Sequence, residues 1–284
     1  IMGKVVSYIK IVRPLNVISG AIAILFSALI VEYKGSIELV LLPMLVVVFF
    51  TIGANVLNDY YDFEVDKINR PDRAIITGEV PRVHALYISI FSFIIGILIA
   101  LQLNQLSQLI SIGISFPLLV FYNAKLKNYP LIGNVVVAFI LGLSFIYAGS
   151  VFNNIDPLMV PAFLAFGLTL IREIVKDIED IDGDKNGNLS TLPIILGRKR
   201  TSYIVFGMSV LAMFGTVYYI YIHLYGYTYA IVYFLLFTLA PLLYFSIKIW
   251  DAKNKSDYTF LSKLLKVIML LGMCSLLLYT FVII

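Results

Sequence analysis

The chain has 284 residues, of which 61% are hydrophobic and only 13% are charged, and its mean hydropathy is +0.95. This composition excludes an ordinary soluble domain and places nearly the whole chain in a lipid bilayer. The formal net charge of +4 does not indicate a nucleic-acid partner, because the basic runs are short and no nucleic-acid motif accompanies them.

Apolar runs of about twenty residues recur along the chain, and each could cross the hydrocarbon core at about 1.5 Å per helical residue. They predict an all-α, polytopic membrane protein with a single domain over residues 1–284. We expect a helical bundle around a central cavity, with two acidic loops capping its cytoplasmic end. The nine predicted spans are 15–33, 39–59, 82–101, 105–122, 131–151, 157–179, 201–222, 228–249 and 261–284.

The segment V-R-P-L-N precedes the first predicted span and places Arg13 and Asn16 at its inner mouth. These two side chains could bind the headgroup of an acceptor molecule. For Arg13 an equally good interpretation is snorkelling, in which a long cationic side chain reaches from a membrane helix to the interface.

A first acidic motif follows the second predicted span. Asp59, Asp62 and Asp66 have the spacing i, i+3, i+7, which places three carboxylates along one stripe of a helix. Asn58 shares a stripe with Asp62 and Asp66, and Asp59 lies about 100° around the helix from Asn58. The sequence therefore leaves open whether Asn58 or Asp59 faces a ligand.

A second motif repeats this spacing 118 residues later, at Asp177, Asp180 and Asp184. The offset suggests an internal repeat, about 15–130 and 131–250, followed by a ninth helix at 258–284. A parallel repeat would bring both stripes to one cavity mouth.

Twelve of the seventeen acids fall within residues 59–79 and 173–184, which is a strong concentration of negative charge in an apolar chain. One explanation is that they decorate solvated helix ends, but two matched sets favour a site. Oxygen ligands with no histidine or cysteine among them point to Mg²⁺, which binds one or two carboxylates together with substrate phosphates. A zinc site is not expected, because His84 and His223 fall on opposite predicted sides of the membrane.

Cations lie where a diphosphate would need them. Arg70 and Arg73 follow the first stripe, and Lys125 and Lys127 follow the fourth span in F-Y-N-A-K-L-K. Guanidinium groups bind phosphate bidentately, and lysine acts as a point charge. Each of these cations could also be explained by membrane topology alone.

Twenty of the twenty-one cations fall on one predicted side of the membrane, with Lys34 opposite. The positive-inside rule makes that side cytoplasmic, so the N-terminus and both acidic loops are expected in the cytoplasm of a cell-membrane protein. No feature of the sequence calls for a protein partner.

Four motifs together resemble the UbiA-type intramembrane prenyltransferases. They are N-D-x-x-D-x-x-x-D at Asn58–Asp66, N-R-P-x-R at Asn69–Arg73, Y-x-x-K at Tyr122–Lys125 and D-x-x-x-D at Asp180–Asp184. The resemblance covers nearly the full chain, and it implies that a Mg²⁺-bound allylic diphosphate is ionised and its prenyl group transferred to an acceptor.

The resemblance also implies roles for individual residues. The expected ligands of Mg²⁺–diphosphate are Asn58, Asp59, Asp62, Asp66, Asp177, Asp180 and Asp184. The expected diphosphate contacts are Arg70, Arg73, Tyr122 and Lys125. The residues expected to carry the catalysis are Asp62, Asp66, Tyr122, Lys125, Asp180 and Asp184.

Within the family, R-P-L-N near the start and R-E-I-V-K-D-I-E-D-I-D-G-D-K resemble the archaeal enzymes that prenylate geranylgeranylglyceryl phosphate. This implies geranylgeranyl transfer to a lipid phosphate, which forms the second ether bond of archaeal lipids. Transfer to a quinone precursor or to heme remains an alternative. A secondary transporter is a distant one, because transporters usually place ionisable residues near the membrane midplane.

Overall fold

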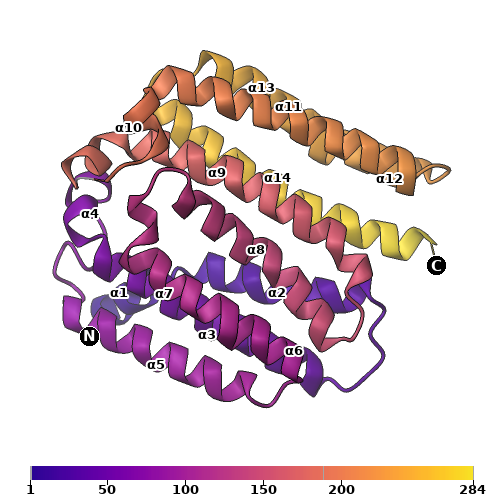
Figure 1. Cartoon of the computed structure of the whole chain (residues 1–284), viewed down its shortest axis with the longest axis horizontal. Helices are drawn as coiled ribbons and strands as arrows, with labels where there is room; N and C mark the ends of the chain where they lie inside the picture. Colours follow the sequence, from indigo (N-terminus) through magenta and orange to yellow (C-terminus); the bar gives the residue numbers. More distant parts are fainter. Residues whose placement is uncertain (1, 188, 284) are drawn as a thin grey trace.

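The computed structural model describes residues 2–187 and 189–283, and every regular element within them is helical. Figure 1 shows the long helices running side by side, with the short helices α4 (Phe63–Asn69) and α10 (Leu192–Leu196) together at one end of the bundle. The all-α bundle that the sequence predicts is confirmed.

Seven long elements are single helices. They are α2 (Pro14–Ile30), α3 (Glu38–Tyr61), α5 (Arg82–Ala100), α8 (Ile132–Val151), α9 (Met159–Asn186), α11 (Arg198–His223) and α14 (Lys255–Ile283). Two more are composite. One joins α6 (Gln105–Gln108), a π-helical turn (Leu109–Ser115) and α7 (Phe116–Ala124), and the other joins α12 (Thr228–Phe234), a π-helical turn (Leu235–Leu239) and α13 (Ala240–Asp251).

The helices support a multi-pass membrane protein. Within the described residues, seven segments are long and apolar enough to cross a bilayer, and these coincide with the second to eighth predicted spans. The first span, α2, has only 17 residues and meets the end of α1 (Met2–Val12) at a bend of 48°. The ninth predicted span lies within α14. The total of nine spans stays a prediction.

The buried apolar side chains form two main clusters. The first is built from α2, α3, α5 and α8, with Phe50 and Phe93 among its larger members. The second is built from α9, α11, α13 and α14 around Phe245 and Tyr258. Large apolar side chains such as Phe214 are exposed on the outer surface, as expected for helices that face lipid.

The two composite spans have the same local arrangement. In each, a π-helical turn comes directly before an X-Pro pair, at Pro117 and at Pro241. Proline lacks the N–H that would bond to the preceding turn, and a wider turn is one way for a helix to accommodate it. The parallel agrees with the predicted internal repeat, which nonetheless stays a prediction.

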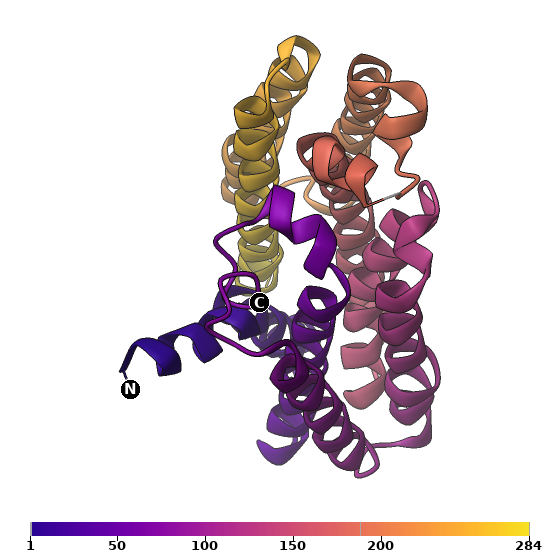
Figure 2. The same cartoon turned by 90° about the vertical axis from the view of Figure 1, so that its left-hand side faces the viewer.

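Close packing between α8 and α9 fixes the position of the helix that carries the second acidic motif. A Cβ at Gly142 of α8 would lie 2.8 Å from the carbonyl oxygen of Ala162 on α9, so only glycine allows this approach. Small residues at helix crossings are a common device for packing membrane helices. Figure 2, which looks along the bundle from the α4 end, shows α1 projecting sideways from the other helices.

Candidate active site

One large cavity of about 1020 Å³ lies inside the bundle. Its inner walls are mostly apolar, with Phe50, Leu119, Phe145 and Leu168 among the lining side chains. Residues of both acidic motifs line the end of the cavity next to α4. The cavity therefore joins a charged mouth to an apolar interior, and its volume is at the upper end of the range for small-molecule sites, about 300–1,000 Å³.

The first acidic motif reaches this cavity through a break in the helix. Asp62 ends α3 and begins α4, so the stripe continues from one helix into the next. Asn58, Asp62 and Asp66 all line the cavity. The Nδ2 of Asn58 donates to Oδ2 of Asp62 at 2.6 Å, and the ammonium group of Lys127 forms an ion pair with the same carboxylate.

Asp59 does not line the cavity, whereas Asn58 does. Of these two neighbours, Asn58 is therefore the one that faces the cavity. The side chain of Asp59 is 5% exposed and forms ion pairs with Arg13 and with Nη1 of Arg73, the latter at 2.9 Å. The rotation of about 100° from Asn58 turns it away from the cavity and toward these arginines. Asp59 thus joins α3 to the start of α2, and we leave it out of the proposed metal site.

The second motif also faces the cavity, with Asp177, Asp180 and Asp184 all lining it. Oδ2 of Asp177 accepts a hydrogen bond from Nδ2 of Asn134 at 2.8 Å. Oδ2 of Asp180 accepts one from Nη2 of Arg70 at 3.1 Å, and its buried Oδ1 has no hydrogen-bond partner.

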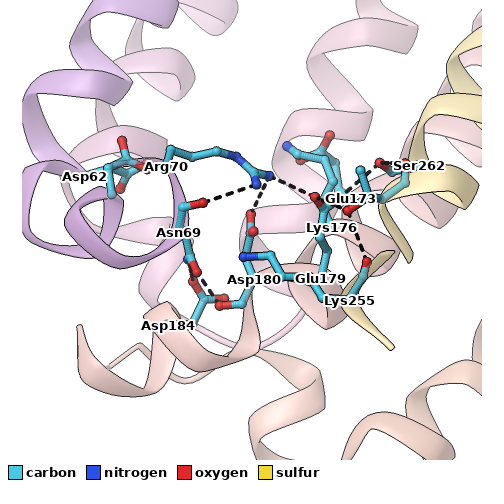
Figure 3. Close-up of polar contacts among 12 residues, drawn as sticks. Asp62, Asn69, Arg70, Glu173, Lys176, Glu179, Asp180, Asp184, Lys255 and Ser262 are labelled. Carbon is cyan, nitrogen blue, oxygen red and sulfur yellow. Dashed lines mark hydrogen bonds and ion pairs between the residues drawn. The ribbon is translucent and has the colours of Figure 1, made fainter. Parts of the chain in front are cut away.

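Side chains at the end of α4 connect the two motifs across the cavity mouth (Figure 3). Nδ2 of Asn69 donates to the backbone oxygen of Asp180 at 3.1 Å and to Oδ1 of Asp184 at 3.4 Å. Nη2 of Arg70 also lies 3.3 Å from Oε1 of Glu179. Two motifs separated by more than a hundred residues therefore lie together at one end of the cavity.

This connection depends on a glycine in α9. A Cβ at Gly183 would lie 2.3–2.4 Å from the side-chain atoms of Asn69, which is closer than real contacts allow. We expect Gly183→Ala to displace Asn69, to lower stability by about 1–3 kcal/mol and to weaken prenyl diphosphate binding. Thermal unfolding in detergent and donor binding would measure these effects. Gly207→Ala is the matched control, because its Cβ would meet nothing within 4 Å; equal behaviour of the two variants would contradict the prediction.

Arg70, Arg73 and Lys127 line the cavity, but Lys125 does not. The chain turns at Lys125 directly after α7 ends, and its side chain is exposed, whereas the side chain of Lys127 is 13% exposed. The diphosphate contact that the resemblance implies for Lys125 therefore fits Lys127 better in this structure.

This pair of lysines offers a direct comparison. We expect Lys127→Gln to raise KM for the prenyl diphosphate roughly 10- to 100-fold, because a buried charged donor is lost. Lys125→Gln should change KM by less than about twofold, as is usual for exposed charges. Steady-state kinetics with varied donor would decide, and a larger effect at Lys125 would restore the assignment made from the sequence.

The remaining predicted residues lie close to the same cavity. Tyr122, Arg13 and Asn16 all line it. Nη2 of Arg13 donates to Oδ1 of Asn58 at 2.9 Å in addition to its ion pair with Asp59. Asn16 accepts a hydrogen bond from the ammonium group of Lys266 at 3.0 Å.

Several side chains at the cavity are not among the expected site residues, including Asn69, Lys127, Asn134 and Lys266. The first opens the N-R-P-x-R motif and the second belongs to F-Y-N-A-K-L-K, so both had a signal in the sequence. Asn134 and Lys266 lie within apolar spans and become visible only when the helices are packed.

Electrostatics and ligand chemistry both favour a divalent cation at the mouth. Burial raises the pKa of Asp66 to about 6, although Arg73 opposes the shift and Asp62 adds to it. Across the described residues, no three carboxylate, histidine or cysteine groups are close enough to hold a metal by themselves. Mg²⁺ does not require such a cluster, because it keeps water ligands and shares substrate phosphates. The unpartnered acceptor oxygens of Asp180 and Asn69 fit this type of binding.

Several known proteins are similar to this chain. It is 32% identical over 270 residues to the digeranylgeranylglyceryl phosphate synthase of Methanosphaera stadtmanae. The aligned region covers 94% of this chain and 97% of that protein. It is 40% identical over 193 residues to the enzyme of the same name from Methanothermobacter thermautotrophicus, with 68% and 67% of the two chains covered.

Solved structures show the same architecture. A structure of digeranylgeranylglyceryl phosphate synthase in membranes is 28% identical and has a TM-score of 0.75, with 98% of this chain and 99% of that chain covered. A UbiA homologue from Archaeoglobus fulgidus, bound to DMAPP and Mg²⁺, has a TM-score of 0.63 at 16% identity, with 95% and 99% covered. This second likeness concerns the fold alone. The model of the UbiA prenyltransferase family matches residues 20–267, and the chain therefore belongs to that family.

Proposed function

We propose that this prenyltransferase moves a geranylgeranyl group from geranylgeranyl diphosphate to the hydroxyl group of geranylgeranylglyceryl phosphate, in a Mg²⁺-dependent reaction. The product would carry the second ether bond of archaeal membrane lipids. The observation that carries this proposal is the single cavity that joins carboxylates of both motifs to a long apolar interior. The names of the relatives support the choice of donor and acceptor.

Mg²⁺ would be held by residues of both acidic motifs. They are Asn58, Asp62 and Asp66 on one side of the cavity mouth and Asp177, Asp180 and Asp184 on the other. The ion, when bound, supplies Lewis-acid stabilisation of charge on the diphosphate. Solved relatives of the same fold contain Mg²⁺ with prenyl diphosphates, which supports the proposal.

The chain's own cations would complete the donor site. Arg70, Arg73 and Lys127 line the mouth and can donate hydrogen bonds to phosphate oxygens. Their charge stabilises the diphosphate as the bond to prenyl C1 breaks. The glycerol hydroxyl oxygen then bonds to C1, and its proton passes to a carboxylate of the mouth or to the released diphosphate.

The apolar walls have a separate role in this scheme. Side chains such as Phe50 and Phe145 surround the interior of the cavity and exclude water from it. Water would otherwise compete with the acceptor hydroxyl for the cationic prenyl group. We further propose that the mouth faces the cytoplasm, because the cations of the chain concentrate on that side.

The test is an assay of the purified full chain in detergent with geranylgeranyl diphosphate and Mg²⁺. We expect ether product and diphosphate with geranylgeranylglyceryl phosphate, and neither after chelation of the metal. 4-Hydroxybenzoate is the competing acceptor. Product with 4-hydroxybenzoate alone would refute the lipid acceptor, and the absence of Mg²⁺-dependent diphosphate release with either acceptor would refute the proposed function.

A further inference from the structure

A second group of cations lines the same cavity, deeper than the acidic mouth. Arg172 and Lys176 lie on α9 within the predicted span 157–179, and Lys266 lies on α14 within the predicted span 261–284. Charged side chains inside membrane spans are costly, so they usually mark a functional site. The donor site described above uses none of these three residues.

Contacts between α9 and α14 place the three cations at a similar depth in the helical bundle. Oε1 of Glu179 on α9 accepts a hydrogen bond from Thr259 of α14 at 2.9 Å. Its Oε2 accepts one from Ser262 at 3.3 Å (Figure 3). The two helices run in opposite directions, and Lys266 is one turn past Ser262. It therefore lies level with the turns of α9 before Glu179, where Arg172 and Lys176 are found.

Two buried polar atoms of this group lack a protein partner. The buried Nε of Arg172 has no hydrogen-bond partner. The hydroxyl group of Thr169, one turn deeper on α9, also lacks a partner, and the residue is 1% exposed. Lys266 bonds to the amide oxygen of Asn16 and, within the described chain, to no carboxylate. Unsatisfied buried donors that line one cavity indicate an oxyanion ligand.

The charge of the group identifies the type of anion. Glu173 is the one carboxylate paired with it, at 2.9 Å from Nη1 of Arg172 and 2.8 Å from Nζ of Lys176. These three cations and this carboxylate together carry a charge of +2, with Asp177 counted as part of the neighbouring metal site. A phosphomonoester carries about −1.5 to −2 at pH 7, so its charge is complementary.

We propose that Arg172, Lys176 and Lys266, with Asn16 and Thr169, form the binding site for the phosphate of the acceptor lipid. This inference rests on the proposed function. Lys176 is four residues, or about 6 Å, from Asp180 along α9, and Arg172 is about 12 Å away. An acceptor held here has its glycerol unit between its own phosphate and the donor diphosphate. Both tails then occupy the apolar part of the cavity.

Arg13 is not part of this proposed phosphate site. Its guanidinium group is engaged by Asp59 and Asn58, so it positions the first motif. Asn16 keeps the role in acceptor binding that the sequence suggests, because it holds the ammonium group of Lys266 at the cavity wall.

The test compares two acceptors in two enzymes, with the full chain in detergent. Geranylgeranylglyceryl phosphate and the phosphate-free geranylgeranylglycerol are offered to the wild type and to Lys266→Gln. We expect the variant to lose roughly 10- to 100-fold of the preference in kcat/KM for the phosphorylated acceptor. Its activity with the phosphate-free acceptor and its KM for the donor should change by less than about twofold.

Two further variants keep the test decisive. Lys263→Gln is the matched control, because Lys263 is exposed on the same helix and does not line the cavity. Arg172→Gln should reproduce the loss of preference if Lys266→Gln does not fold. An unchanged preference in a folded variant, or a rise in the donor KM alone, would overturn the inference. Failure of the wild type to use the phosphorylated acceptor would instead refute the proposed function.

Discussion

Replacing Asp62 with asparagine is expected to lower kcat/KM for prenyl transfer by at least about 1,000-fold, equivalent to about 4 kcal/mol. Asp62 is at the break between α3 and α4, lines the cavity, and carries the charge that Lys127 now pairs with. Asparagine keeps the shape and one acceptor oxygen but cannot supply an anionic metal ligand. Steady-state kinetics at varied Mg²⁺ would measure the loss.

The matched control for Asp62→Asn is Glu64→Gln, two residues further along α4. Glu64 has an exposed side chain whose ion-pair partner is Lys67, and it does not line the cavity. Its replacement should leave activity within about twofold of wild type. If Asp62→Asn retained more than about a tenth of wild-type activity while staying folded, Asp62 could not be a metal ligand.

A loss of similar size is expected for Asp180→Asn, with little change in thermal stability. Its Oδ1 is buried without a partner, and Arg70, which bonds to its Oδ2, also pairs with Glu179. Removing the negative charge therefore relieves a desolvation cost and leaves Arg70 with an anion. Activity and thermal unfolding, measured on the same preparation, would separate the role in catalysis from a role in folding.

The control for Asp180→Asn lies on the same helix. Asp182 has a 69% exposed side chain, pairs with Arg198 at 3.1 Å, and does not line the cavity. Asp182→Asn should behave like the wild type. Equal losses at both positions would mean that the negative charge of this region, and not a specific ligand, supports the reaction.

Much of the fold could be predicted from the sequence because lipid imposes length and polarity on each helix. The second to eighth predicted spans coincide with membrane-length segments of the structure. The break at Asp62 was not predicted, because the residues on both sides of it have the pattern of one continuous helix. The bend before α2 was also missed, since Arg13 adopts a left-handed conformation that its residue type does not indicate.

The site was predictable where spacing along one helix decides which side chains share a face. The spacing predicts that Asn58 shares a helix face with Asp62 and Asp66, and all three line the cavity. The spacing alone does not indicate whether Asn58 or Asp59 faces the cavity. Contacts between helices decide the rest. Lys127 lines the cavity because the chain turns after α7, and Lys266 does so because α14 packs against α9. The periodicity of a single sequence does not indicate which helices pack against each other.

The length of α9 has a consequence for substrate selection. Its 28 residues extend about 42 Å, which exceeds the hydrocarbon thickness of about 30 Å. The excess allows Asp180 and Asp184, in the last two turns, to stay at the water-facing edge of the bilayer. A donor whose diphosphate binds there, as proposed, has its first prenyl carbon at that fixed edge. We then expect the depth of the cavity below that edge to set the length of prenyl chain that fits.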